Sequence, residues 1–403
     1  MSKITKIIAR KIIDSRGNPT VEVDIENDNR AFGRAAAPSG ASKGMFEVKD
    51  YPKNDIDVGI KNFNLEVTRK LIGMDASDQR NFDAVLHDID KTEDFSSVGG
   101  NIAIAASMAF AKLSAKSENI ELYRKLFGAK GKPIMPFPLG NIIGGGKHAI
   151  NGTVMQEFLS ISFGKNYIAS AIGNISVHKK VSSLLKSKFP ELSLGLGDEK
   201  AWVAPLTDMQ ALEILSSAIN DSVAKNKIEI SPAIDMAASE FFEDGKYIYK
   251  DKNRSVDEQI DFVSELSERF NIKIIEDPLD EQDFEGFAKL TKKIGKKTLI
   301  VGDDLFVTNK ARLERGIKIG AANAILIKPN QIGTLTDMIE TVALAKKHNY
   351  ECVISHRSGE TEDSTIAHLA VGLGIKYIKT GTIGGERTAK HNELIRIEES
   401  INH

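Results

Sequence analysis

The second half of the chain carries a repeated pattern in which an apolar run ends in a charged or polar residue. Neighbouring end positions are 23 to 41 residues apart, and they are Asp235, Glu276, Asp303, Lys328, His356 and Lys379. A strand, a helix and two loops take roughly 25–30 residues, so the spacing indicates repeated βα units. Because the runs are almost wholly apolar, the strands are expected to be covered on both faces. The pattern predicts a (β/α) barrel, and a doubly wound open sheet is the alternative fold.

The first part of the chain follows different rules. Residues 4–13 and 20–25 predict paired strands around a turn, and residues 31–37 predict a third strand. Residues 54–127 read as helical. We therefore expect an α/β protein with a smaller N-terminal α+β domain.

The boundary between these parts is predicted at the polar, Gly-containing segment 128–133. The expected domains are residues 1–130 and, with the active site, residues 131–403.

Length and composition limit the possible partners. The chain has 403 residues, too many for one ordinary core, and a formal net charge of −2. This balance gives no electrostatic reason to expect nucleic acid or a membrane surface as a partner. The start lacks a signal-peptide core, and the apolar stretch Ile102–Ala111 is too short to span a bilayer. The single cysteine, Cys352, excludes a disulfide framework, and we expect a cytoplasmic protein.

Three acids end successive predicted strands, where a barrel places its active site. Without a cation, Asp235, Glu276 and Asp303 would repel one another, and a hard cation such as Mg²⁺ removes that repulsion. Lys328 and Lys379 would stand opposite the metal, where nearby cations lower the pKa of a lysine toward that of a useful base. Ordinary salt bridges are the alternative interpretation of these acids.

Residues 355–363 place an imidazole, a guanidinium and hydroxyls at the end of another apolar run. Arg357 and Ser358 together are typical of a phosphate-binding pair, and His356 could move a proton. The alternative is a helix N-terminus capped by Ser358, with Glu360 and Glu362 complementing the dipole.

Two further loops have the composition of ligand-binding segments. Residues 38–44 are small and polar, which is typical both of a loop that closes over a ligand and of an ordinary connection. Residues 136–148 read as a glycine-rich turn that ends in His148, without the Rossmann or Walker spacing.

These stretches resemble the enolase family over nearly the full chain, and the glycine-rich stretch 140–146 is more similar to archaeal members. The stretches that carry the resemblance are residues 14–23, 38–42, 156–158, 197–199, 276–278, 302–304, 328–334, 355–363 and 378–381. The resemblance implies a barrel of ββαα(βα)₆ topology behind an N-terminal α+β domain. It implies the reversible dehydration of 2-phosphoglycerate to phosphoenolpyruvate, a step of glycolysis and gluconeogenesis, in a homo-oligomer that is a dimer or an octamer.

The resemblance also implies site residues. Two Mg²⁺ ions are expected, the first held by Asp235, Glu276 and Asp303 and the second by Ser42. Lys328 would be the base at C2, and Glu199, with Glu157 beside it, would protonate the leaving hydroxyl. Lys379 would contact the substrate carboxylate, Arg357 and Ser358 the phosphate, and His356 and His148 would line the pocket.

Two other functions stay open from sequence. A lyase or racemase of the same superfamily could act on a non-phosphorylated acid, although Arg357 and Ser358 argue against it. A non-catalytic binding protein could also retain the fold, but it would have no need of Lys328 or the metal-ligating acids.

Overall fold

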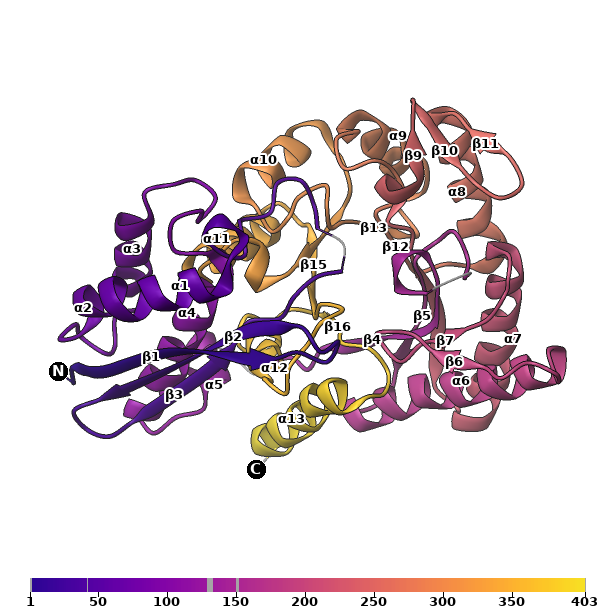
Figure 1. The fold of residues 1–403 in the computed structure, drawn as a ribbon. Coiled ribbons are helices and arrows are strands. Elements are labelled where there is room, and N and C mark those ends of the chain that lie inside the picture. Colours follow the sequence, from indigo (N-terminus) through magenta and orange to yellow (C-terminus); the bar gives the residue numbers. More distant parts are fainter. Residues whose placement is uncertain (1, 42, 129–132, 150–151, 403) are drawn as a thin grey trace.

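The computed structural model describes residues 2–41, 43–128, 133–149 and 152–402. Figure 1 shows a sheet and a group of helices, in indigo and violet, beside a ring of strands surrounded by helices. Within the described ranges, no helix combines the length and the apolar character that a membrane span needs.

The N-terminal part is an antiparallel three-stranded sheet covered by helices. Its strands run in the order β1 (Ile4–Ile13), β2 (Pro19–Asn27) and β3 (Phe32–Ala36), which confirms the predicted strands. Alternate residues of β2 face the helices and are fully buried, as the period of a strand requires. The helices are α1 (Ile56–Asn62), α2 (Thr68–Leu71), α3 (Gln79–Asp90), α4 (Gly100–Ser117) and α5 (Leu122–Phe127), with short helical turns at Pro52–Asn54 and Phe63–Val67.

The C-terminal part is a closed barrel, so the open-sheet alternative is wrong. Its strands are β4 (Phe137–Gly144), β5 (Glu157–Phe163), β8 (Glu229–Asp235), β12 (Ile274–Glu276), β13 (Leu299–Gly302), β14 (Ala324–Ile327), β15 (Glu351–Ser355) and β16 (Tyr377–Lys379). Each strand pairs with the next in this order, and β16 pairs with β4 to close the ring. The β4–β5 and β5–β8 pairs are antiparallel, and the others are parallel.

Helices surround this ring and complete the ββαα(βα)₆ topology that the resemblance implied (Figure 1). They are α6 (Tyr167–Lys188), α7 (Asp208–Asn226), α8 (Val256–Phe270), α9 (Phe284–Ile294), α10 (Lys310–Ile319), α11 (Leu335–Lys347), α12 (Thr365–Gly372) and α13 (Gly385–Asn402). Two small β-structures lie outside the ring. One is the hairpin of β6 (Gly195–Leu196) and β7 (Trp202–Val203). The other is the sheet of β9 (Phe242–Glu243), β10 (Lys246–Ile248) and β11 (Asn253–Arg254). Short helical turns lie at Gly146–His148, Ala238–Phe241 and Pro329–Gln331.

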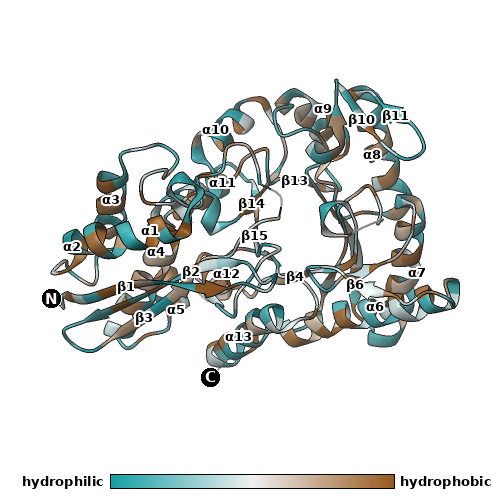
Figure 2. Cartoon of the chain, in the orientation of Figure 1, coloured by the Kyte–Doolittle hydropathy of each residue, from teal (hydrophilic) through white to brown (hydrophobic). Residues whose placement is uncertain are grey.

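Strand β14 shows why the barrel strands are apolar throughout. Ala324 and Leu326 belong to the cluster that fills the barrel, while Ile325 and Ile327 belong to the cluster between strands and helices. Both faces of the strand are therefore buried. In Figure 2 the surrounding helices carry brown as well as teal residues, as expected for helices with one buried face.

Residues 136–148 were predicted as a turn, but most of them form β4. A Cβ at residue 140 would lie 3.2 Å from Asn174 Cβ and closer still to Thr382 Oγ1. The absence of a side chain at Gly140 therefore allows close packing inside β4. The turn is limited to the residues that follow Gly144.

Gly33 sets the distance between the N-terminal sheet and helix α4. A Cβ at this position would lie 2.6 Å from the backbone nitrogen of Leu113 and closer still to the carbonyl oxygen of Ala109. Both neighbours are backbone atoms of α4, so neither can rotate away. The two elements can pack this closely only because residue 33 has no side chain.

We therefore expect Gly33→Ala to destabilise the protein by about 1–3 kcal/mol, the usual cost of overpacking a core. Urea unfolding followed by circular dichroism measures this change. Gly195→Ala is the control, because a Cβ there meets no atom within 4 Å. Equal stability of the two variants would contradict the close packing at Gly33.

Candidate active site

The barrel register brings the predicted strand-end residues to one rim. Glu157 on β5 is paired with Asp235 on β8, and Asp235 is paired with Glu276 on β12. Asp303 follows β13 directly, and Lys379 ends β16 beside β15. We call this edge the carboxyl rim, because most of its strands end there.

A small polar cavity opens at the carboxyl rim. Its lining consists of Gly40, Ala41, Gln156, Glu157, Glu199, Asp235, Lys328, Ser355, His356, Arg357, Ser358 and Lys379. The structure thus brings eight of the predicted site residues to one cavity, with Glu276 and Asp303 in contact with its two lysines. Two others cannot be placed, because Ser42 and the side chain of His148 lie outside the described residues.

Lys379 lies at the centre of the acidic groups. Its Nζ is 2.9 Å from Asp235 Oδ2, 2.8 Å from Glu276 Oε2 and 3.2 Å from Glu157 Oε2. Burial alone would lower the pKa of Lys379, but the surrounding carboxylates outweigh burial and raise this pKa well above its usual value. This ammonium group is therefore the cation that holds the three acids together.

The carboxylates at the carboxyl rim still outnumber the lysine side chains there. Burial, together with the charge of Asp235, raises the pKa of Glu276 well above its usual value. Burial and the charge of Glu199 do the same for Glu157. Buried carboxylates with raised pKa values are stabilised by an added cation, so the chemistry of this donor set fits a hard divalent ion.

Asp277 and Asp304 lie close to the predicted metal ligands. Ligand oxygens of Asp277, Asp303 and Asp304 all lie within 4.8 Å of one another. Asp277, however, accepts the backbone N–H groups of Asp303 (2.9 Å) and Asp304 (2.7 Å). It therefore holds the turn that presents Asp303 to the rim, a role that the sequence did not reveal.

Lys328 lies on the same rim and forms an ion pair with Asp303. The predicted lowering of the pKa of Lys328 depends on a bound metal and stays a prediction. The residues of the chain by themselves act in the opposite direction. Burial and the charge of Arg357 lower the pKa of Lys328, but the carboxylates of Asp303 and its neighbours outweigh them and raise it. The ion pair with Asp303 keeps the proton on the amine.

Glu199 faces the cavity from the loop between β6 and β7. Its Oε2 accepts a hydrogen bond from Asn141 Nδ2 at 3.1 Å and lies 3.4 Å from His356 Nε2. Burial lowers the pKa of His356 to about 4, with the carboxylate of Glu199 opposing and the charge of Arg387 adding to this shift. His356 is therefore neutral at neutral pH.

Arg357 and Ser358 are held by residues of the N-terminal part. Arg357 donates to Glu47 at 2.9 and 3.1 Å and to Asn330 Oδ1 at 3.0 Å. Ser358 Oγ accepts the backbone N–H of Ala41 at 2.6 Å. Helix α12 begins only at Thr365, so the alternative in which Ser358 caps a helix is wrong.

Sequence reasoning missed several residues that complete this site, among them Glu47, Asn141 and Arg387. Asn330 could have been found, because it belongs to the 328–334 stretch of the resemblance. Nothing in the local pattern marks Glu47 or Arg387, which reach the rim from distant elements.

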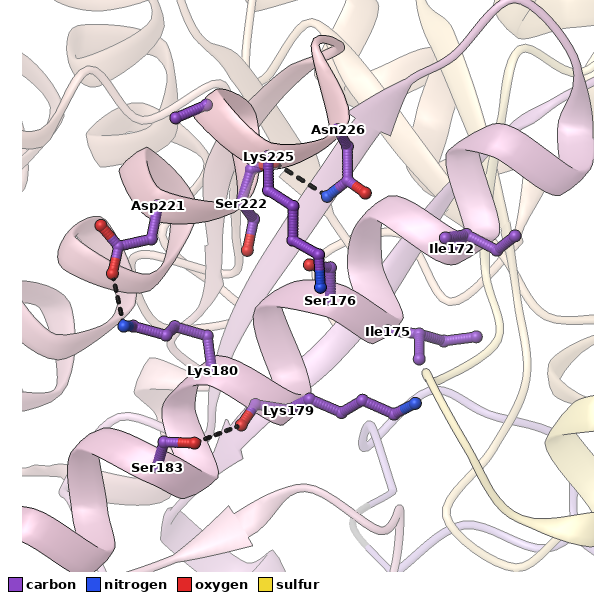
Figure 3. A pocket seen from close by; sticks show the side chains of 11 residues that line it. Ile172, Ile175, Ser176, Lys179, Lys180, Ser183, Asp221, Ser222, Lys225 and Asn226 are labelled. Carbon is purple, nitrogen blue, oxygen red and sulfur yellow. Dashed lines mark hydrogen bonds and ion pairs between the residues drawn. The ribbon is translucent and has the colours of Figure 1, made fainter.

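A second cavity lies on the outer wall, between α6 and α7 (Figure 3). It measures about 630 Å³ and is lined by lysine, serine and isoleucine side chains, with Lys180 paired to Asp221 at 2.6 Å. No group of converging acids lines it within the described residues, unlike the rim. The outer-wall cavity therefore does not have the composition of the predicted site.

Comparison with known proteins supports one family over the whole chain. The family models described as "Enolase, N-terminal domain" and "Enolase, C-terminal TIM barrel domain" match residues 4–126 and 132–403. The enolase of Methanothermobacter thermautotrophicus is 51% identical over 406 residues, covering 99% of this chain and 97% of the relative. The enolase of Methanocorpusculum labreanum is 48% identical, covering 99% and 100%, and that of Thermoplasma acidophilum is 47% identical, covering 99% and 98%.

The buried pair of Glu47 and Arg357 links the N-terminal part to the rim. We expect Glu47→Ala to lower the free energy of unfolding by about 3–5 kcal/mol, because it removes the carboxylate from a buried ion pair. Urea unfolding followed by circular dichroism measures this loss.

The matched control is Glu213→Ala, which breaks an exposed pair with Arg269 and should cost about 1 kcal/mol or less. A Glu47→Ala variant as stable as this control would show that the buried pair does not hold the two parts together.

Proposed function

The chain belongs to the enolase family, whose reaction is the reversible dehydration of 2-phosphoglycerate to phosphoenolpyruvate, and we propose how its own residues perform this reaction. The protein is a lyase of glycolysis and gluconeogenesis. The observation that carries our proposal is the convergence of Lys328, Glu199 and the acids around Lys379 on one cavity.

We assign the base at C2 to Lys328. Its amine faces the rim cavity, and its proton is held by the ion pair with Asp303. A cation bound to Asp303 would reduce the charge that this carboxylate exerts on the amine. The charge of Arg357 and burial would then lower the pKa of Lys328, as a base requires.

We assign the acid to Glu199, with Glu157 as its partner. The charge of Glu199 contributes to the raised pKa of Glu157, so these buried groups interact strongly. Two interacting buried carboxyls do not both ionise readily, which favours a proton retained on the pair. That proton can be delivered to the leaving hydroxyl, and the same pair accepts it again in the reverse reaction.

We assign two Mg²⁺ ions to the site. Asp235, Glu276 and Asp303 would hold the first, and Ser42, outside the described residues, would ligate the second. When bound, Mg²⁺ supplies positive charge that stabilises the negative charge developing on the substrate carboxylate. Lys379 would bind that carboxylate from its position among the acids.

The phosphate would be bound by Arg357 and Ser358. His356 lines the cavity, and His148, whose side chain lies outside the described residues, would line it as well. The guanidinium of Arg357 is oriented by Glu47 and Asn330 beside Ser358, which suits an anion with several oxygens. A related lyase or racemase that acts on non-phosphorylated acids would not need this pair.

Three further proposals rest on membership of the family rather than on the carboxyl rim. We propose domains of residues 1–130 and 131–403, which the two separate family models support. We also propose a cytoplasmic homo-oligomer, a dimer or an octamer, and light scattering on the purified protein distinguishes these masses. Neither nucleic acid nor a membrane is part of the proposal.

The absorbance of phosphoenolpyruvate tests the function directly. After addition of 2-phosphoglycerate and Mg²⁺, we expect the absorbance to rise, to stop rising with EDTA, and to recover with excess Mg²⁺. Turnover in the presence of EDTA would contradict the metal assignment. Turnover of a sugar acid but not of 2-phosphoglycerate would favour the related lyase or racemase.

Two substitutions separate the two proton transfers. Lys328→Ala should abolish both the exchange of the C2 proton with solvent and dehydration, because no base remains. Glu199→Gln should retain this exchange but lose dehydration by about 10²–10⁴-fold, the usual contribution of general acid catalysis. NMR measures exchange in deuterated water, and absorbance measures dehydration.

Lys310→Ala is the matched control for the lysine variant, because Lys310 is half exposed and pairs with Glu340 on the surface. Exchange at the wild-type rate in Lys328→Ala would remove this lysine from its role. Simultaneous loss of both activities in Glu199→Gln would contradict the two-step assignment.

A further inference from the structure

A buried arginine lies behind the rim, in the first turn of α13. Arg387 has no exposed surface, and a cation at a helix N-terminus opposes the helix dipole. Its NH1 contacts His356 Nδ1 at 2.6 Å and donates to the carbonyl oxygen of Arg357 at 2.6 Å, while NH2 donates to the carbonyl oxygen of Ser358 at 2.8 Å. One guanidinium thus holds three consecutive residues of the rim.

This contact determines which nitrogen of His356 carries the proton. A guanidinium has only donor groups, so Nδ1 must accept the hydrogen bond from Arg387. The proton of the neutral imidazole is then on Nε2. The lowered pKa of His356 is consistent with this, since burial and Arg387 lower it while the carboxylates of Glu199 and Glu360 raise it.

The Nε2 proton points to the proposed acid. His356 Nε2 lies 3.4 Å from Glu199 Oε2, the same oxygen that accepts from Asn141 Nδ2 at 3.1 Å. Asn141 and His356 therefore both present N–H groups to this oxygen of Glu199.

We propose that Arg387 is a positioning residue that fixes His356 as its Nε2–H tautomer and so turns an N–H group toward Glu199 Oε2. This inference rests on the proposed acid role of Glu199 for its catalytic consequence, but not for the tautomer itself. In this arrangement His356 turns an N–H group toward the acid and does not itself supply the proton.

The competing explanation is purely structural. Arg387 could serve only to tie down the backbone of Arg357 and Ser358 through their carbonyl oxygens. Its loss would then displace the phosphate-binding pair and impair every step together. A positioning role predicts instead that dehydration suffers while exchange of the C2 proton continues.

The tautomer can be read in the unaltered holoenzyme by solid-state NMR with ¹⁵N-labelled histidine and arginine. The His356 signals are identified by their loss in His356→Gln. We expect a protonated Nε2, an unprotonated Nδ1, and a coupling between Nδ1 and an Arg387 Nη proton. A proton on Nδ1, or the absence of that coupling, would overturn the proposal.

Kinetics then test the consequence. We expect Arg387→Met to lower the kcat of dehydration by about 10- to 100-fold, the scale of lost orienting partners, while C2 exchange changes little. Arg387→Lys, which retains a donor, should restore part of the loss. Arg396→Met is the matched control on the same helix, because Arg396 is exposed and pairs with Glu393.

Equal loss of exchange and dehydration in Arg387→Met would support the structural explanation and overturn the positioning role. If the wild-type enzyme lacked turnover of 2-phosphoglycerate, the proposed function would fail, yet the NMR measurement would still decide the tautomer. The two failures are therefore distinguishable.

Discussion

Pairing of the last barrel strand with the first is the constraint on which the site depends. Strand β16 lies parallel to β4, with Lys379 opposite Leu139, and this pairing closes the ring. Closure brings Lys379 within reach of Glu157, Asp235 and Glu276, which come from strands far away in the sequence. An open sheet with the same strand order would leave β16 and β4 at opposite edges, and the acids would lose their central cation.

The barrel brings more negative charge to the carboxyl rim than the lysines there can neutralise. Five buried carboxylates, those of Glu157, Glu199, Asp235, Glu276 and Asp303, face the amines of Lys328 and Lys379. Burial of unpaired charge is costly, and removal of one partner from a buried pair typically costs about 3–5 kcal/mol. Burial and, after it, the neighbouring carboxylates raise the pKa values of Glu157 and Glu276. The same excess makes the rim a favourable place for divalent cations and a retained proton.

The barrel does not build the site alone. Glu47 and Ala41 of the N-terminal part bind Arg357 and Ser358, and Ser39 exchanges two backbone hydrogen bonds with Gly359 at 2.7 and 2.8 Å. From the other end of the chain, Arg387 reaches the same segment through α13. The 355–360 segment is therefore held from several directions, which suits a segment that must present a guanidinium and an imidazole at fixed positions.

The sequence by itself determined the spacing of the βα units and the residues that end the strands. These features depend on contacts between near neighbours, so composition and period suffice to find them. It favoured the closed barrel and left the open sheet as the alternative, and it misjudged residues 136–148, whose glycines serve close packing in a strand. Only the tertiary structure decided the raised pKa of Lys328, the turn held by Asp277 and the roles of Glu47 and Arg387. Electrostatic interactions and hydrogen bonds depend on distance in space, and the closed barrel places residues side by side that the sequence separates by hundreds of positions.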